Sequence, residues 1–457
     1  MRPDPDTLPG RLCHRLPLVL CLFLLALPVQ AQTLALETCA APDSGVSILL
    51  AELWEFSREE DPGYRVSEQQ LRSAAAERDA VQREWLPTLD LNLAGDHGQR
   101  TSPGEERVLG VGPRAELRLV GQWTLLDSSR RWRAYEAESR EAAARQGARL
   151  FDVEHRAALA RLYIEASVSE SAIEIHQRHQ DLLDDLLESV RLRVAAGVDT
   201  SWEQLLLEEA SARIARRRAQ VEGVHAGLVA ELSELVGRCV RAAVIPPAAI
   251  APDPPPVAGE VRRAETSPEI LKLRRDADAI EARARVEASR QRWRLDLIGI
   301  AGPTRSRAFD PGPVEEEYLV GLSASWSPDL RGLRSRLSEA ELARGRSVEA
   351  EAESQRVAVT RELARIEAGL AHSGSERERL SKEFESAQRR LDAALRRWSE
   401  GMDRWTEVMQ AVERLQDVES MQLDWLRTTT LDLIRLHEAR GTLEAILVHF
   451  GQEGDDR

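Results

Sequence analysis

The sequence predicts a mainly α-helical protein with a small β part, built from two internal repeats. Charged residues make up 30% of the 457 residues and the hydrophobic group 42%, a balance typical of long helices and coiled coils. Short segments in which polar and apolar residues alternate interrupt this sequence, and they occur in both halves of the chain. Because the same features return in the same order, the two halves are predicted to share one architecture.

The N-terminus predicts a secretory signal peptide over residues 1–31. Basic residues precede an apolar run at residues 16–27, and the sequence VQA at residues 29–31 fits a small-residue cleavage site. An apolar run this short cannot span a bilayer as a helix. The mature chain is therefore expected to be exported.

The first repeat is predicted to cover residues 32–243. A helix-like segment leads into the sequence TLDLNLAG, in which leucines alternate with polar residues. A polar loop and a second alternating run follow, so residues 86–126 are predicted to form a β-hairpin. A long helical tract without proline comes next, and a turn near residues 197–200 reverses it into a returning helix.

The second repeat is predicted to cover residues 261–451. It follows a Pro-rich linker at residues 244–260, whose prolines cannot continue a helix. The sequence RLDLIGIAG belongs to a predicted β-hairpin over residues 293–328. A second long helical tract follows, with its turn near residues 401–404 and its own returning helix. Residues 452–457 form a short acidic tail.

The two turns between long helices align residue by residue. A helix reversal needs glycine for its positive φ, and an aspartate just after it can cap the returning helix. Both residue types therefore have a structural explanation at these turns. The aligned pairs are Gly197 with Gly401, Asp199 with Asp403, Arg193 with Arg397 and Glu203 with Glu407.

The strands predict a membrane barrel that one chain cannot complete. Four strands are too few, because the smallest transmembrane barrels have about eight, whereas three chains would supply twelve and leave no open edge. Leu89, Leu91 and Leu93 would then face lipid, and Asp90 and Asn92 would face a watery lumen. A small soluble sheet that caps a helical bundle is the alternative.

Tryptophans mark the ends of the predicted strands, where transmembrane barrels carry aromatic girdles. They are Trp85, Trp123, Trp293 and Trp326. Ordinary core packing is the alternative explanation for these side chains.

Together these features resemble the TolC family of outer-membrane efflux proteins, the outer-membrane factors. The resemblance is carried by the sequence LPTLDLNLAG, the hairpin end WTLLDSSRR, the turn RVAAGVDTSWEQLLLEEA and the second copy of each. It covers nearly the whole mature chain. It implies a homotrimer with a twelve-stranded β-barrel in the outer membrane of a Gram-negative bacterium, continued by a long antiparallel α-helical barrel in the periplasm.

The resemblance also implies a function and partners. The trimer would be a passive exit duct for efflux or type I secretion, driven by an inner-membrane transporter through a periplasmic adaptor that meets the two turns. Glu203 and Glu407 match acidic positions near the closed end of the duct, where a ring of like charges favours cations. Arg193 and Arg397 would offset the repulsion by pairing across helices, although an exposed ion pair contributes only about 0–1 kcal/mol.

Other classes of function find little support in the sequence. A net charge of −15 argues against nucleic-acid binding. The sequence contains no phosphate-binding loop, HExxH motif or nucleophile elbow, so neither an enzyme nor a cofactor is predicted. His176 and His179 have helical spacing but no further ligand nearby, which favours a solvated face over a metal site.

Two points stay open at this level. Cys39 and Cys239 would be able to pair in an oxidising compartment. The competing hypothesis for function is a soluble periplasmic coiled-coil adaptor or scaffold, which the same long helices would also suit.

Overall fold

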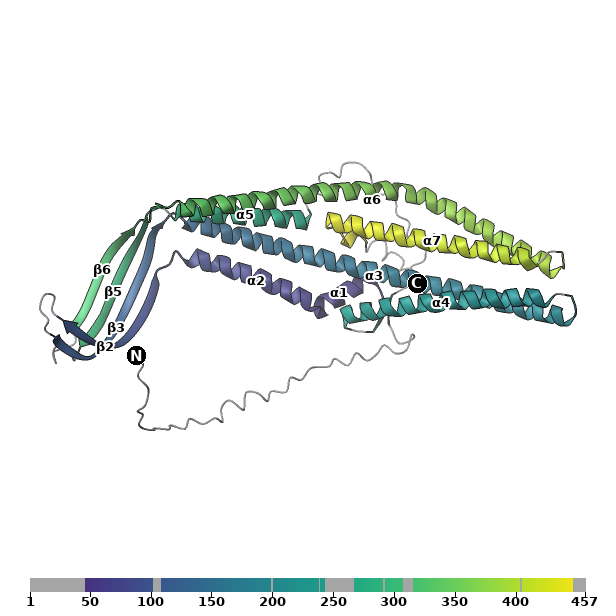
Figure 1. Ribbon diagram of the computed structural model, residues 1–457, viewed down its shortest axis with the longest axis horizontal. Coiled ribbons are helices and arrows are strands. Elements are labelled where there is room, and N and C mark those ends of the chain that lie inside the picture. Colours follow the sequence, from purple (N-terminus) through teal and green to yellow (C-terminus); the bar gives the residue numbers. More distant parts are fainter. Residues whose placement is uncertain are drawn as a thin grey trace, which may run out of the picture. The chain divides into compact units, whose positions relative to one another are not determined.

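The computed structural model describes residues 46–101, 108–198, 200–237, 239–242, 267–290, 292–306, 315–402 and 405–446. They belong to one compact unit, Val46–Arg457, and combine long helices with a four-stranded sheet (Figure 1). The expected signal peptide, Pro-rich linker and tail lie outside the described residues, as do Asp199, Asp403 and Cys39. Among the helices in these ranges, none combines the length and the apolar composition needed to cross a membrane.

Two helices are much longer than the rest. α3 spans Arg130–Ala195 with 66 residues, and α6 spans Leu333–Ser399 with 67 residues. At 1.5 Å per residue each is about 100 Å long, so each needs packing partners along its whole length. The shorter partners are α2 (Pro62–Arg83), α4 (Ser201–Val236), α5 (Pro268–Ser289) and α7 (Trp405–Arg440).

The helices lie side by side in an order that changes halfway along α3 and α6. In the half nearer the sheet, α2 contacts α3, α3 contacts α5 and α5 contacts α6 (Figure 1). In the half nearer the turns, α4 contacts α3, α3 contacts α7 and α7 contacts α6. In both halves α6 therefore lies at one margin of the row, with α2 or α4 at the other.

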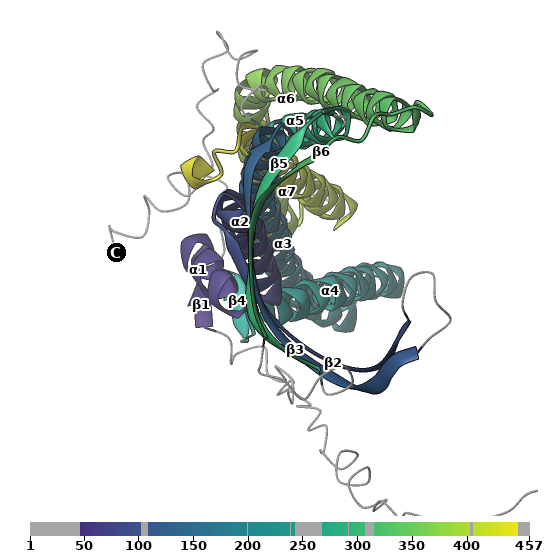
Figure 2. The same ribbon diagram turned by 90° about the vertical axis from the view of Figure 1, so that its left-hand side faces the viewer.

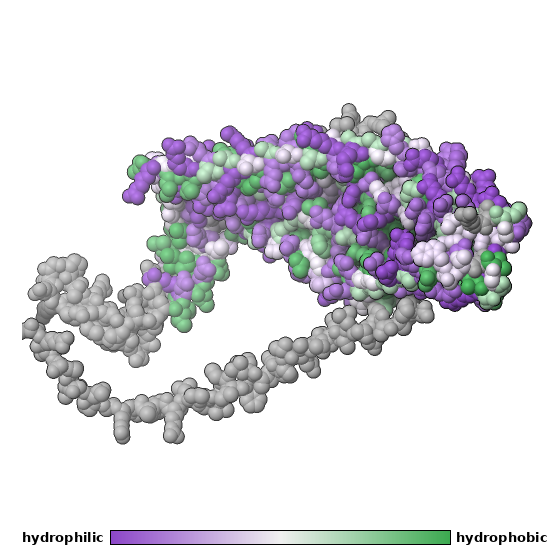
Figure 3. All heavy atoms as spheres, turned by 45° about the vertical axis from the view of Figure 1, so that its right-hand side comes forward, coloured by the Kyte–Doolittle hydropathy of each residue, from purple (hydrophilic) through white to green (hydrophobic). Residues whose placement is uncertain are grey.

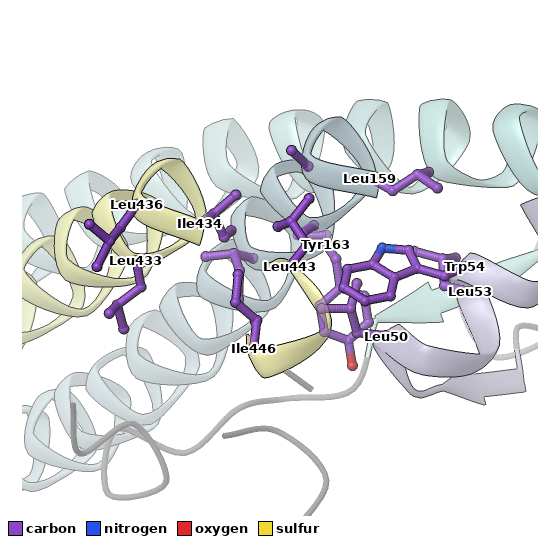
Figure 4. Packing of buried hydrophobic residues seen from close by; sticks show 14 of the residues in the cluster. Leu50, Leu53, Trp54, Leu159, Tyr163, Leu433, Ile434, Leu436, Leu443 and Ile446 are labelled. Carbon is purple, nitrogen blue, oxygen red and sulfur yellow. The ribbon is translucent and has the colours of Figure 1, made fainter. Parts of the chain in front are cut away.

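Buried hydrophobic side chains form two clusters along these helices. One lies toward the turns and joins the two helical hairpins, for example through Leu183 on α3 and Val412 on α7. The other lies where α1 (Leu50–Glu60) packs on α3, with Trp54 and Tyr163 among its members (Figure 4). Each fully buried side chain of this size contributes about 1.5–3 kcal/mol, so the clusters hold the helices together.

A polar joint fixes the bend between α1 and α2 against α3. Asp61 caps α2 by accepting a hydrogen bond from the Gly63 amide at 2.6 Å, and its second oxygen lies 3.2 Å from His155 Nδ1. The other ring nitrogen of His155 lies 2.5 Å from the Ser57 hydroxyl. Ser57 is completely buried, so this Ser–His–Asp row offers a substrate no access and serves to hold the helices.

The four strands of the sheet are antiparallel and follow the order β2–β3–β5–β6 (Figure 1). Seen from its far end, the sheet forms one curved layer (Figure 2). They are β2 (Thr88–Thr101), β3 (Val108–Asp127), β5 (Arg294–Ser306) and β6 (Glu315–Ser325). β3 and β5 join the two repeats, since one comes from each half of the chain. They approach closely at Gly302, where an added Cβ would lie 2.0 Å from the Leu117 carbonyl oxygen.

The strands are longer than the sequence predicts. The polar loops expected after the first strand of each hairpin begin later, because β2 continues to Thr101 and β5 to Ser306. Glycine, proline and charged residues favour a loop there. Pairing with the neighbouring strand nevertheless satisfies the backbone N–H and C=O groups of these residues, so the strands continue. The returning helix of the second repeat, α7, ends at Arg440, short of the predicted end of that repeat.

A short parallel pair of strands beside α1 was not predicted from the sequence. β1 (Val46–Ile48) pairs with β4 (Val240–Ala242). Three-residue strands carry too few residues for a period to be recognised. Cys239, next to β4, is disulfide-bonded, while its expected partner Cys39 is not among the described residues.

The predicted fold class is confirmed for a single chain. It is mainly helical and carries a small antiparallel sheet beyond one end of the helices (Figure 1). The series α2, β2, β3, α3 and α4 returns as α5, β5, β6, α6 and α7, as two internal repeats require.

Candidate functional site

Strand pairing sorts the side chains of the sheet onto an apolar face and a more polar face. Leu91 lies opposite Leu119 and Leu297 opposite Leu322, whereas Thr124 lies opposite Asp296. Because side chains alternate along each strand, these pairs fix both faces. The apolar face carries Leu89, Leu91, Leu93, Leu117, Leu119, Trp123, Leu295, Leu297, Val320 and Leu322. The other face carries Asp90, Asn92, Arg118, Gln122, Thr124, Arg294, Asp296, Ser323 and Ser325, interspersed with Val120, Ile298 and Ile300.

The apolar face is open to its surroundings. Leu93 and Val320 are each 81% exposed, and hydrophobic side chains gather over the sheet in the space-filling view (Figure 3). On the other face Asp296 is only 7% exposed, accepts a hydrogen bond from Thr124 Oγ1 at 2.7 Å and lies 2.9 Å from Arg294 Nε. A continuous exposed apolar surface needs lipid or protein to cover it, and the chain's own helices do not.

All four tryptophans predicted at the strand ends lie at the end of the sheet nearest the helices. Trp123 Nε1 donates to the Trp85 carbonyl oxygen at 2.9 Å, and the rings of Trp293 and Trp326 stack with centroids 5.5 Å apart. Trp123 lies on the apolar face of β3, and the exposed fractions of the four side chains run from 43% to 59%. Core packing within the chain does not account for side chains this exposed.

The sheet and the row of helices both end in uncovered margins. Among the described strands, β2 pairs only with β3 and β6 only with β5. Such edges present unpaired backbone groups that can pair with another chain. At the same margin as β2, helix α2 has no buried residue. A single copy of the chain therefore leaves the strand edges and the α2 surface uncovered, and another chain is able to pack against them.

The two helical turns have the same backbone geometry. Gly197 and Gly401 both have a φ of 76°. The Val198 amide donates a hydrogen bond to the Arg193 carbonyl oxygen at 2.8 Å, and the Met402 amide donates one to the Arg397 carbonyl oxygen at the same distance. This is a Schellman motif. An added Cβ at either glycine would meet nothing within 4 Å, so the positive φ alone requires glycine.

The two acids predicted near the duct axis have different surroundings within one chain. Glu203 Oε2 accepts a hydrogen bond from the Thr200 amide at 3.0 Å and completes a capping box at the start of α4. Glu407 is exposed in the first turn of α7. Helix capping within the chain therefore explains the glutamate at position 203, but not the one at position 407.

Arg193 makes a contact that the sequence did not predict. Its guanidinium carbon lies 5.1 Å from the centre of the Trp398 ring, and Trp398 is buried. This contact ties the end of α3 to the end of α6. A cation over an aromatic ring contributes about 0.5–2 kcal/mol, comparable to the exposed ion pair that the sequence suggested.

A basic groove between α6 and α7 was also missed. It has a volume of about 550 Å³, and its lining includes Arg389, Arg390, Arg397 and Arg414 together with Glu407. Arg414 pairs with Glu383 at 3.1 Å, outside this lining. The consecutive Arg389 and Arg390 could have predicted a basic surface on α6. The groove itself forms only because α7 packs beside them.

The expectation for the two histidines was wrong for one of them. His179 is 4% exposed and its Nε2 bonds to Glu419, which is 6% exposed. The pair links α3 to α7 and is buried between them rather than on a solvated face. Helical spacing could not reveal this, because the partner lies 240 residues away in the sequence.

Comparison with known proteins finds a family match in the second repeat and a shared fold over most of the chain. Residues 262–442 match the family model described as outer membrane efflux protein, and no curated protein matches the sequence. The outer-membrane channel OprN is 20% identical, with 86% of this chain and 90% of that chain covered and a TM-score of 0.74. The outer membrane protein VceC from Vibrio cholerae is 17% identical, with 86% and 96% covered and a TM-score of 0.74.

A third solved structure leads to the same fold. The MtrE outer membrane channel of Neisseria gonorrhoeae is 16% identical, with 86% of this chain and 89% of that chain covered and a TM-score of 0.73. These likenesses establish the fold across both repeats, and the family model matches the second repeat. The second repeat therefore resembles the outer membrane efflux protein family, and the described chain shares its fold with these three outer-membrane structures.

Proposed function

We propose that this protein is the outer-membrane exit duct of a tripartite efflux or type I secretion system. Three copies close their sheets into a twelve-stranded barrel in the outer membrane of a Gram-negative bacterium, and their helices continue the duct into the periplasm. The observation that carries this proposal is the sheet, with its exposed apolar face, its partly covered polar face and its free edges at β2 and β6.

The margins of one copy suggest how three copies join. β6 of one copy pairs with β2 of the next, which removes every open edge from the lipid. Along the helices, α6 meets α2 of the next copy near the sheet and α4 of the next copy toward the turns. This arrangement supplies α6 with partners along its length and covers α2, which has no buried residue in a single chain.

The duct is passive, and its energy comes from an inner-membrane transporter. A periplasmic adaptor connects the two by docking on the helical turns at residues 197–200 and 401–404. Exposed apolar side chains at the first turn support such a contact, since Val198 is 65% and Trp202 65% exposed. Large apolar residues at an exposed tip are typical of a surface that binds another protein.

The turns also form the narrow end of the duct. Glu203 and Glu407 form acidic rings around the three-fold axis, which favour cations and repel anions. Arg193 and Arg397 offset the repulsion between these like charges. At the other end, Trp85, Trp123, Trp293 and Trp326 lie at the interface between lipid and water.

Three measurements on the purified mature protein test this proposal. We expect it to require detergent for solubility, to have the mass of three chains and to conduct ions in planar bilayers. A protein that is monomeric and soluble without detergent would refute the duct and favour a soluble adaptor or scaffold. A detergent-dependent protein with the mass of one chain would refute the shared barrel.

A further inference from the structure

The rim where the sheet meets the helices carries guanidinium groups that the chain does not neutralise. The side chains of Arg292 and Arg331 are exposed, and neither has a hydrogen-bond or ion-pair partner among the described residues. The nearby acids are already engaged. Asp329 accepts hydrogen bonds from two amides at the start of α6, at 2.9 and 3.0 Å, and Glu287 pairs with Arg290 at 3.0 Å.

Two contacts bring together the segments that carry these arginines. Trp293, which follows Arg292, stacks on Trp326 at the end of β6. Arg334 Nη1 donates a hydrogen bond to the Arg290 carbonyl oxygen at 2.7 Å. The junction between α5 and β5 therefore lies beside the junction between β6 and α6, which carries Arg331.

The same rim exposes large apolar side chains. Trp293 is 57% exposed, Trp326 55% and Leu330 90%. Arg294 and Ser325 form the last pair of β5 and β6 and lie on the polar face, so the adjacent Trp293 and Trp326 continue the apolar face. The rim is therefore an apolar surface with two unneutralised cations at its border, and it continues the face that is proposed to contact lipid.

We propose that this rim binds the phosphate of an anionic phospholipid in the leaflet nearest the helices. Arg292 and Arg331 hold the phosphate, and the tryptophan pair contacts the glycerol and the first part of the acyl chains. A planar guanidinium matches the geometry of phosphate oxygens, and basic side chains at a membrane surface attract anionic lipids. The lipid site rests on the proposed orientation of the sheet in the membrane, but that orientation does not by itself require a bound anionic lipid.

Native mass spectrometry of the full mature protein in detergent tests the site. The probes are dioleoylphosphatidylglycerol, which is anionic, and dioleoylphosphatidylcholine, which is zwitterionic. We expect the wild-type protein to prefer the anionic lipid. The double substitution Arg292→Gln and Arg331→Gln should weaken that binding by roughly tenfold or more, at about 1 kcal/mol per arginine, and leave phosphatidylcholine binding unchanged.

The matched control removes the same charge from a distant part of α6. Arg365→Gln and Arg379→Gln change side chains that are 69% and 67% exposed, and lipid binding should stay at the wild-type level. Arg292→Lys and Arg331→Lys keep the charge without the guanidinium geometry, so we expect an intermediate affinity. Equal weakening in the control, or a wild-type protein with no preference for the anionic lipid, would overturn the site.

Two further outcomes would assign the rim to another ligand. Inorganic phosphate lacks acyl chains and should not displace the lipid, so displacement at equal concentration would reveal a site for free anions instead. Dissociation of the Arg292→Gln, Arg331→Gln protein into single chains would make the rim a contact between copies. A soluble monomeric wild type would refute the proposed duct itself, whereas a conducting trimer without arginine-dependent lipid binding would refute the lipid site alone.

Discussion

Glu203 has two proposed roles that substitutions can separate. Its carboxylate accepts a hydrogen bond from the Thr200 amide within the chain, and in the proposed trimer its charge also belongs to a ring around the duct. Glutamine keeps an acceptor oxygen for the cap and loses the charge. Alanine loses both.

We expect Glu203→Gln to reduce the cation selectivity of the trimer and leave its thermal stability unchanged. Glu203→Ala should reduce both, because it also removes the hydrogen bond from the Thr200 amide that completes the capping box. Reversal potentials in planar bilayers measure selectivity, and circular dichroism on heating measures stability. Glu209→Gln is the control, on an exposed position of the same helix. Wild-type selectivity in Glu203→Gln would place this carboxylate away from the ion path.

His155 predicts a loss of stability in mild acid. Burial lowers the pKa of His155 below its ordinary value of 6.5, while Asp61 and Asp152 oppose that shift. Well above pH 6.5 the imidazole is neutral in both the folded and the unfolded chain. As the pH falls below that value the unfolded chain takes up the proton first, so the free energy of unfolding decreases until the folded pKa is passed.

We therefore expect the melting temperature to fall between about pH 7.5 and about pH 5, and His155→Gln to reduce the size of that fall. The exposed His372, changed to Gln, is the matched control on another helix. Differential scanning fluorimetry in detergent at the two pH values measures the effect. The same decrease in the wild type and His155→Gln would assign it to other groups.

At the scale of elements, sequence reasoning succeeded where one physical signal is strong. Long proline-free amphipathic tracts predicted α3 and α6 within a few residues of their bounds, and period-two alternation predicted the strands and their apolar face. It failed where the deciding interaction comes from a distant segment. The ends of β2 and β5 depend on pairing with a neighbouring strand, and β1 and β4 are too short to show a period.

The candidate site divides in the same way. Glycine at the two turns could be predicted, because the need for a positive φ is local. The contact of Arg193 with Trp398 and the bond of His179 with Glu419 could not, because each joins segments far apart in the chain. The sequence can predict that a residue lies on a helix. Which side of that helix is buried by a distant segment depends on the packing of the folded chain.

Gly302 predicts a strict size limit between β3 and β5. An added Cβ would lie 2.0 Å from the Leu117 carbonyl oxygen, and the strands would have to separate. We expect Gly302→Ala to lower the melting temperature of the trimer in detergent or to prevent its assembly. Gly299→Ala is the control on the same strand, since its Cβ would meet nothing within 4 Å. Equal melting temperatures in the two variants would contradict this close approach.

At the scale of the whole molecule, the two faces of the sheet predict opposite responses to the same substitution. Leu322 lies on the apolar face and Ser323 on the polar face of β6. We expect Leu322→Arg to destabilise the barrel in lipid, by up to about 2–4 kcal/mol near the bilayer midplane. Ser323→Arg should leave stability unchanged and shift conductance toward anions.

Folding yield into liposomes and single-channel recordings measure these two responses. The two substitutions add the same charge one residue apart, so each serves as the control for the other. Loss of folding in Ser323→Arg with normal folding in Leu322→Arg would reverse the assignment of the two faces. The face now assigned to lipid would then line the lumen, and the face assigned to the lumen would contact lipid.

The length of β3 extends the proposed channel beyond the membrane. β3 has 20 residues, and a tilted strand needs only about 9–11 residues to cross the hydrocarbon layer. The far part of the β2–β3 hairpin would then stand above the outer leaflet as a collar in the external medium. A cysteine introduced at position 98 should react with an impermeant maleimide on intact cells, and one at position 91 should not. Antibodies outside such a cell would then be able to reach the part of the hairpin around position 98.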